Sequence, residues 1–288
     1  MLRKIFVAAI LAMFMLSSQV AFADVKIDWK KFPQIGSKVE LFRHIEDERR
    51  KGQTNFYMNF TDELKPYDNN DFCNLFVVPE VTSEIVESDE TNAKVIYKIT
   101  EYPGTRVANA YLSGNTVGLT SDEKKLYPLA AEIANTAKRY SLPAAQERFI
   151  YDLICGRVTF YDEENKLDES GKLKSFNTAI GALVDRKAND KGIADAFYML
   201  CRMCDLNVSR IGGYIGTTPH TWNTITFEDG RSYCVDVTDG INTGLRSLLN
   251  APLEVIQKTH RCDWELIPNL QQTVDSRYGM NSSRFLLR

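Results

Sequence analysis

The 288-residue sequence predicts an α+β fold in which one helix packs on an antiparallel sheet. Apolar residues at helical spacing mark this helix at residues 193–206. Two alternating segments follow, one from His220 and one over residues 233–238, and the Asp229-Gly230 pair between them is typical of a β-hairpin turn. With 44% hydrophobic and 25% charged residues, the composition is that of an ordinary globular protein and excludes a disordered chain.

The first 23 residues have the pattern of a secretory signal peptide. A basic start, residues 1–4, precedes an apolar run at residues 5–16 and the small-x-small cleavage site Ala21-Phe22-Ala23. The run is too short for a transmembrane helix, and no later stretch is apolar enough to span a bilayer. We therefore expect an exported chain, secreted, periplasmic or at the cell surface, with no membrane partner after cleavage.

The net charge gives no sign of a nucleic-acid partner. Cleavage before Asp24 removes Arg3 and Lys4 from the 35 basic residues and none of the 38 acidic ones, so the formal charge falls from −3 to −5. A protein that binds nucleic acid is expected to carry a basic surface instead.

Residues 24–120 predict a small β-containing region ahead of the main domain. Helical spacing is found at residues 38–50, and strands are expected at residues 54–60 and 93–102. Turn-rich segments at residues 65–71 and 87–92 separate these elements.

The elements of residues 121–288 begin with two helices. The first starts at Ser121, with Pro128 expected to limit its first turn, and the second covers residues 143–156. The charged stretch at residues 162–174 is interpreted as a solvated loop. A strand is expected at residues 207–215, with a bend or bulge at Gly212-Gly213.

Two residues of the predicted hairpin form a candidate catalytic pair. His220 opens the run His220-Thr221-Trp222-Asn223, and Asp236 lies in the second segment, so the two can face each other across paired strands. A carboxylate that holds one imidazole nitrogen fixes the tautomer, as a general base beside a nucleophile requires. The nucleophile is expected upstream.

These motifs resemble the core of the transglutaminase-like superfamily, which has a papain-like fold and includes transglutaminases, cysteine proteases and many secreted bacterial proteins. Residues 178–184 and 189–197 align without a gap to a family segment of the type S-A-Y-G-A-L-V-x-x-x-x-V-C-x-G-Y-A-x-A-F. The resemblance implies that Asp190 occupies the position of the catalytic cysteine and that His220 and Asp236 are the other triad members. It also implies a family domain at residues 121–288, with a C-terminal helix near residues 246–260, after an accessory region.

The exchange of cysteine for Asp190 decides the expected function. A helix start favours an anion, so Asp190 can replace a thiolate electrostatically. A carboxylate is nevertheless a poor nucleophile toward an amide. We therefore expect a catalytically inactive module that binds a peptide or cell-surface ligand, without a cofactor. Trp222 and Asn223 are the candidate binding residues.

Two other hypotheses remain for the same residues. An active cysteine protease or transglutaminase-type enzyme would need a displaced thiol near His220, for which Cys155 and Cys234 are the candidates. Alternatively, Asp190, His220 and Asp236 would bind a divalent metal ion. His260 is expected to lie at the surface.

The six cysteines all follow the signal peptide and permit up to three disulfides, with no pairing favoured. Cys201 and Cys204 lie three residues apart on the predicted helix, which favours core packing over a redox motif. Zinc binding by this pair with Cys262 or His260 stays an alternative, although a four-ligand pattern is absent.

Overall fold

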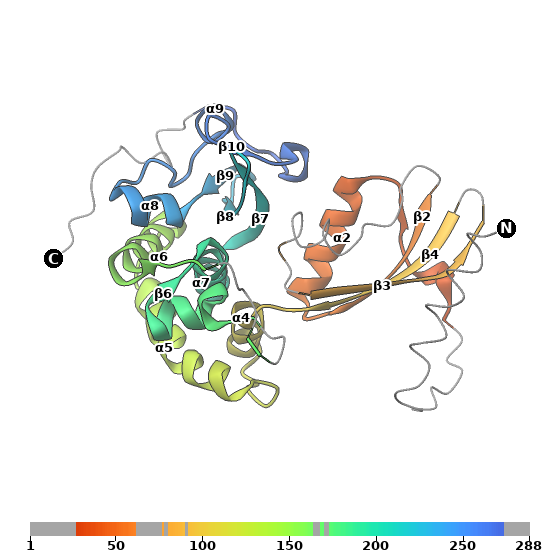
Figure 1. Ribbon diagram of the computed structural model, residues 1–288, viewed down its shortest axis with the longest axis horizontal. Coiled ribbons are helices and arrows are strands. Elements are labelled where there is room, and N and C mark those ends of the chain that lie inside the picture. Colours follow the sequence, from red (N-terminus) through yellow and green to blue (C-terminus); the bar gives the residue numbers. More distant parts are fainter. Residues whose placement is uncertain are drawn as a thin grey trace. The chain divides into compact units, whose positions relative to one another are not determined.

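The computed structural model describes residues 27–61, 77, 80–89, 92–163, 168–169 and 173–273 (Figure 1). The predicted signal peptide, Cys73 and much of the charged stretch at residues 162–174 lie outside these ranges. Helices and antiparallel strands are both abundant, which confirms the α+β class. In the described ranges no helix is both long enough and apolar enough to cross a membrane.

The chain divides into two compact units, Met1–Phe32 and Pro33–Arg288. Of the first, the structure describes a single 3-10 turn, Trp29–Lys31, in which the Trp29 and Phe32 rings meet edge to face. All other elements belong to the second unit. The predicted boundary near residue 120 stays a prediction.

The first sheet of the second unit has the strand order β1-β2-β4-β3. Its strands are β1 (Gln34–Ile35), β2 (Asn55–Thr61), β3 (Glu80–Ser88) and β4 (Asn92–Thr100). Helix α2 (Lys38–Arg50) begins after Ser37, whose side chain accepts the N–H of Glu40, and it buries Leu41 and Ile45. The predicted helix and two predicted strands are confirmed, whereas β1 and β3 were not predicted.

Three helices precede the elements of the candidate site: α4 (Pro103–Ser113), α5 (Ser121–Ala137) and α6 (Pro143–Arg157). A capping box between Thr120 and Glu123 starts α5. Pro128 lies inside α5, so the expectation that it limits the first turn is wrong. Leu126 and Ile133, on either side of the proline, are buried, and their core packing stabilises the helix around it.

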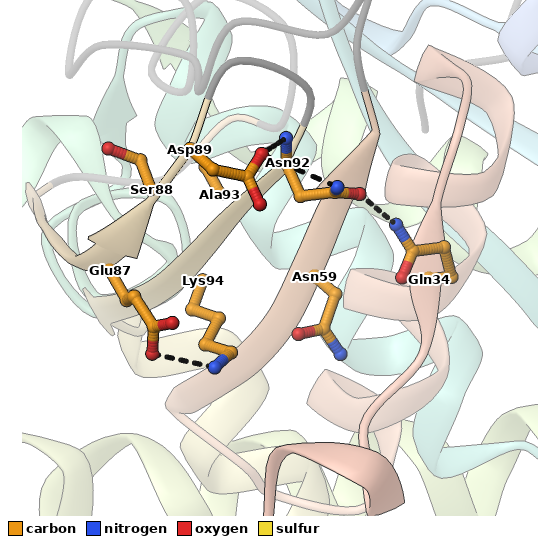
Figure 2. Close-up of a pocket in the computed structure, with 8 residues that line it drawn as sticks. All are labelled: Gln34, Asn59, Glu87, Ser88, Asp89, Asn92, Ala93 and Lys94. Atoms are coloured by element: carbon orange, nitrogen blue, oxygen red, sulfur yellow. Dashed lines mark hydrogen bonds and ion pairs between the residues drawn. The ribbon is translucent and has the colours of Figure 1, made fainter.

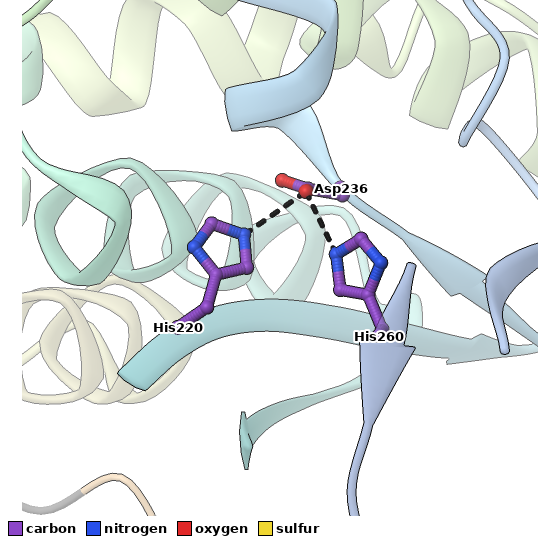
Figure 3. Close-up of side chains that lie close together, drawn as sticks. All are labelled: His220, Asp236 and His260. Carbon is purple, nitrogen blue, oxygen red and sulfur yellow. Dashed lines mark hydrogen bonds and ion pairs between the residues drawn. The ribbon is translucent and has the colours of Figure 1, made fainter. Parts of the chain in front are cut away.

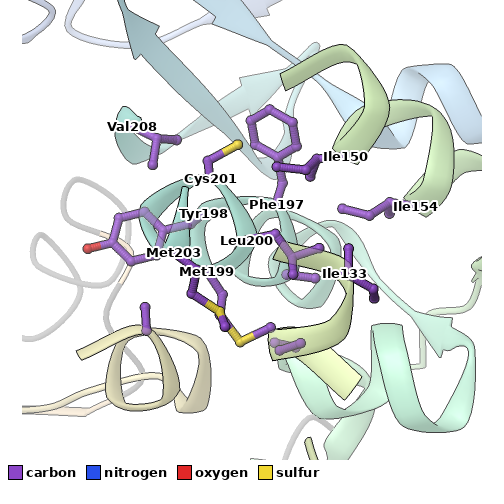
Figure 4. Close-up of a cluster of buried hydrophobic side chains, with 14 of the residues drawn as sticks. Ile133, Ile150, Ile154, Phe197, Tyr198, Met199, Leu200, Cys201, Met203 and Val208 are labelled. Carbon is purple, nitrogen blue, oxygen red and sulfur yellow. The ribbon is translucent and has the colours of Figure 1, made fainter. Parts of the chain in front are cut away.

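Helix α7 (Asp190–Met203) is the buried centre of the unit (Figure 4). Phe197 and Leu200 on this helix lie in one core cluster with Ile150 and Ile154 of α6. The side chain of Asn189 accepts the N–H of Gly192 and caps the helix. The helix therefore begins at Asp190, three residues before the apolar pattern that predicted it. This rigid helix fixes the position of its first residue, Asp190.

The second sheet is antiparallel throughout, with the order β10-β7-β8-β9. Its strands are β7 (Asn207–Ile215), β8 (Thr218–Thr226), β9 (Ser232–Val235) and β10 (His260–Arg261). The predicted hairpin at Asp229-Gly230 is confirmed as the β8–β9 connection. A short parallel pair, β5 (Thr159–Phe160) and β6 (Lys187–Ala188), and a π-helical turn, Gly181–Asp185, lead into α7.

Two expectations for the C-terminal part are wrong. Asp236 is not a strand residue but the N-cap of α8 (Val237–Thr243), because its side chain accepts the N–H groups of Thr238 and Asp239. The expected helix at residues 246–260 shrinks to α9 (Leu253–Ile256), which is followed by a turn into β10 and by the 3-10 turn Trp264–Leu266.

Gly213 does not form the predicted bend or bulge, since β7 and β8 pair without a register shift through this residue. A Cβ atom here would lie 2.3 Å from the Arg261 carbonyl oxygen and 2.5 Å from the Trp222 ring. We expect Gly213→Ala to lower the free energy of unfolding by about 1–3 kcal/mol, because it overpacks this contact. Urea denaturation tests this, with Gly118→Ala as the control because its Cβ would meet nothing within 4 Å.

Glu147 of α6 is fully buried, and burial raises its carboxyl pKa from 4.5 to about 8, although Asn250 donates to it at 3.0 Å. The Glu147 carboxyl of the folded chain therefore stays protonated up to about pH 8, whereas in the unfolded chain it loses its proton near pH 4.5. Between about pH 5 and pH 8 we expect this group to lower the free energy of unfolding by about 1.4 kcal/mol per pH unit as pH rises.

Glu147→Gln should remove this slope, which urea denaturation at several pH values measures. Glu132→Gln, on the exposed side of α5, is the matched control and should leave the slope unchanged. Identical slopes in wild type and Glu147→Gln would contradict a neutral buried carboxyl.

Candidate functional site

The three predicted triad residues lie side by side. Asp190 is the first residue of α7, His220 lies on β8, and Asp236 caps α8. The Oδ2 atom of Asp190 is 3.5 Å from Nδ1 of His220, and Nε2 of His220 is 3.0 Å from Oδ2 of Asp236. The imidazole of His220 therefore bridges two carboxylates.

Asp190 is held in place by backbone groups of a neighbouring element. The N–H of Thr221 donates to its Oδ2 at 2.7 Å, which ties the start of α7 to β8. Burial raises the pKa of the Asp190 carboxyl, while the His220 imidazole and the backbone donors oppose that rise. Its side chain is 14% exposed, so the carboxylate is largely covered yet still reached by solvent.

The carboxylate of Asp236 is anionic and fully satisfied. Its Oδ1 accepts the N–H groups of Thr238 at 2.9 Å and Asp239 at 3.2 Å, which leaves Oδ2 for imidazole. Burial alone would raise the pKa of Asp236, but hydrogen bonds from His220 and His260 hold it well below its usual range. In turn, burial would lower the pKa of His220, and the two flanking carboxylates raise it above its ordinary value.

His260 belongs to this site, so the expectation that it lies at the surface is wrong. It is 1% exposed, its Nε2 is 3.1 Å from Oδ2 of Asp236, and its Nδ1 is 2.8 Å from the Thr259 hydroxyl (Figure 3). Only the pairing of β10 with β7 brings it here. A strand of two residues leaves no periodic signal in the sequence, which is why this residue was missed.

Trp222 and Asn223, the predicted binding residues, are both 1% exposed and form part of the core. The Trp222 ring stacks on His220 with centroids 6.1 Å apart and meets His260 edge on at 5.0 Å. Asn223 donates its amide N–H groups to the carbonyls of Ala194 and Ser209. These contacts give both residues a packing role in place of the predicted binding role.

Neither Cys155 nor Cys234 provides the exposed thiol beside His220 that an active enzyme would need. Cys234 is fully buried and pairs with Thr224, four residues or about 13 Å along β8 from His220. Burial raises the pKa of its thiol to about 12. The Cys155 thiol contacts the Val237 carbonyl oxygen at 3.7 Å, and burial also raises the pKa of this thiol.

The other described cysteines form no alternative site. Cys201, Cys204 and Cys262 are unbridged, as are Cys155 and Cys234. Within the described ranges, the one group of at least three potential metal ligands with converging donor atoms is His220, Asp236 and His260. This group differs from the predicted set of metal ligands, because His260 takes the place of Asp190. The Asp190 carboxylate faces Nδ1 of His220, whereas the group converges on Nε2.

A separate polar pocket of about 260 Å³ lies on the first sheet (Figure 2). Lys94 pairs with Glu87 at 2.7 Å, and Asn92 contacts both Asp89 and Gln34. These charged and amide side chains, which line the pocket, thus bind one another.

No protein-family model and no curated protein sequence matches this chain. Among solved structures, the chain is similar to a TGase, with 10% identity and a TM-score of 0.33 over 64% of this chain and 51% of that one. It is similar to a candidate cysteine protease from Cytophaga hutchinsonii, with 13% identity and a TM-score of 0.31 over 62% and 65%. It is also similar to the periplasmic domain of TgpA from Pseudomonas aeruginosa, with 11% identity and a TM-score of 0.34 over 57% and 66%.

The chain therefore spans about half to two thirds of the length of these structures. At such identities and TM-scores, its chemistry has to be inferred from its own residues.

Proposed function

We propose that this chain is an exported transglutaminase-like domain without thiol chemistry, which acts as a binding or structural module for a peptide or cell-surface ligand. The observation that carries the proposal is the position of Asp190, whose Oδ2 lies 3.5 Å from Nδ1 of His220, where the resemblance places a cysteine. The motif at residues 178–197 supports the domain type, and the pattern of residues 1–23 supports export.

A carboxylate at residue 190 cannot perform the acyl transfer that a thiolate performs. Its attack on an amide would form a mixed anhydride, which is less stable than the amide, and the carboxylate would leave again before the amine. His220 adds a second obstacle, because its two ring nitrogens face the carboxylates of Asp190 at 3.5 Å and Asp236 at 3.0 Å and, in the part of the chain that the structure describes, no hydroxyl or thiol nucleophile.

An activity assay tests the catalytic half of the proposal. The purified chain is incubated with fluorogenic peptides and, separately, with a glutamine-containing peptide and a fluorescent amine. We expect hydrolysis and amine incorporation to equal those of His220→Ala. Activity that His220→Ala lacks and that iodoacetamide abolishes would overturn the proposal.

A ligand screen tests the binding half. Peptide pools and cell-wall fragments are added to the purified chain, and its thermal unfolding is followed. We expect at least one pool to raise the unfolding temperature through preferential binding to the folded state. No shift with any pool would argue for a purely structural module.

A further inference from the structure

We propose that His220, Asp236 and His260 form a binding site for a first-row divalent transition-metal ion, with Zn²⁺ the probe of choice. Figure 3 shows both rings directing Nε2 at the same carboxylate oxygen of Asp236. The three residues come from β8, the N-cap of α8 and β10, so the fold assembles a site that no single segment contains. The proposal is independent of whether the chain has lost thiol activity.

The distances between the donor atoms fit a shared ion. The two nitrogen–oxygen separations are 3.0 Å and 3.1 Å, and all three donor atoms lie within 4.8 Å of one another. For metal bonds of about 2.1 Å, two ligand atoms lie about 3.0 Å apart at a right angle and about 3.4 Å apart at the tetrahedral angle. The two nitrogen–oxygen separations match ligands at near right angles.

The remaining contacts orient each ligand. The Nδ1 atom of His220 faces the Asp190 carboxylate at 3.5 Å, and that of His260 faces the Thr259 hydroxyl at 2.8 Å. Metal-bound histidines ordinarily give their other ring N–H to such an oxygen. Without an ion each Nε2 hydrogen-bonds to Asp236, and an ion would take the place of the Nε2 protons. The backbone donors on Oδ1 of Asp236 likewise leave Oδ2 for the ion.

This arrangement gives Asp190 a role that a thiol would fill poorly. A carboxylate accepts a strong hydrogen bond from an imidazole N–H and raises the basicity of the opposite nitrogen. Asp190 is then a positioning residue for His220. Asp190 and His260 would both contribute to the same metal site.

The local charge and the donor types select the ion. The His220 imidazole lies between the carboxylates of Asp190 and Asp236, and Asp236 also contacts His260. With neutral imidazoles this cluster is negative, so a divalent cation compensates it. Two imidazole nitrogens and one carboxylate oxygen suit Zn²⁺, Fe²⁺ or Co²⁺ and disfavour Mg²⁺ and Ca²⁺, which require oxygen ligands.

Calorimetric titration of the tag-free, chelator-treated chain with Zn²⁺ tests the site. We expect a single site in the wild type, and at least about a hundredfold weaker binding in His220→Gln and His260→Gln. Asp190→Ala should weaken binding about tenfold, as loss of a carboxylate behind a ligating histidine does. His44→Ala is the control and should bind like the wild type, since His44 is the one histidine outside the site.

Two further readouts keep the test decisive if a variant folds poorly. Zn²⁺ should raise the thermal unfolding temperature of the wild type and of His44→Ala, but not that of His260→Gln. Electron paramagnetic resonance of Cu²⁺ bound to the wild type should show coupling to two imidazole nitrogens, without any variant. Absence of Zn²⁺ binding, unchanged affinity in both glutamine variants, or a Cu²⁺ spectrum without imidazole coupling would overturn the proposal.

Discussion

Asp190→Cys is expected to create a thiol that reacts with iodoacetamide at about pH 6.5 roughly tenfold faster than free cysteine. The start of α7 and the neighbouring His220 both favour the thiolate, because a helix N-terminus and an imidazolium stabilise an anion. Mass spectrometry of the alkylated chain, in chelator-containing buffer, measures the rate at residue 190.

The double variant Asp190→Cys/His220→Gln is the matched control for this rate. It keeps the helix start and removes the imidazole, so its thiol should react more slowly than that of the single variant. The buried thiols of Cys201 and Cys234 provide an internal reference, since burial raises their pKa values. A residue 190 thiol no faster than free cysteine would contradict the assignment of this position to the nucleophile.

Asp195→Ala is expected to lower the free energy of unfolding by about 3–5 kcal/mol, because it removes the shortest ion pair of a buried arginine and leaves two buried backbone donors unsatisfied. The Asp195 carboxylate is fully buried and accepts from Arg210 at 2.6 Å and from the N–H groups of Gly104 and Ala179 at 3.0 Å and 2.9 Å. Removal would leave the two backbone donors unpaired, and among the described residues the Arg210 guanidinium would keep only Thr105 at 2.8 Å and Glu101 at 3.6 Å as polar partners. Urea denaturation followed by circular dichroism measures the loss.

An exposed ion pair supplies the control for Asp195. Lys125 and Asp122 lie 2.8 Å apart on the surface of α5, where water screens their attraction. Lys125→Ala should therefore leave the denaturation midpoint unchanged. A similarly small effect of Asp195→Ala would mean that Glu101 and Thr105 alone compensate the Arg210 charge.

Local sequence patterns predicted the elements that carry two of the four site residues. The Asp-Gly hairpin is a short-range signal that supplied His220 and Asp236, although a strand was predicted where Asp236 caps α8. The resemblance added Asp190, and the apolar pattern of α7 places this residue at the start of a helix. The polar side chain of Asp236 binds the backbone just ahead of it, and this preference for caps outweighed the alternating pattern.

Long-range contacts account for what the sequence did not predict. The pairing of β10 with β7 brings His260 to the site and the Arg261 carbonyl oxygen close to Gly213. Residues far apart in the chain make this pairing, so no local secondary-structure propensity predicts it. Trp222 was expected beside a ligand, but its ring stacks on His220, meets His260 edge on and is buried in the core. These errors concern which side chains meet, and one-dimensional patterns do not encode that.

The bond from the Thr221 N–H to Asp190 also bears on how such a site could change over evolutionary time. Sulfur accepts hydrogen bonds weakly, so a chain with cysteine at residue 190 would leave this backbone donor poorly satisfied at the junction of α7 and β8. A single exchange to cysteine would then trade stability for reactivity, and it would require compensating changes nearby before selection could favour it.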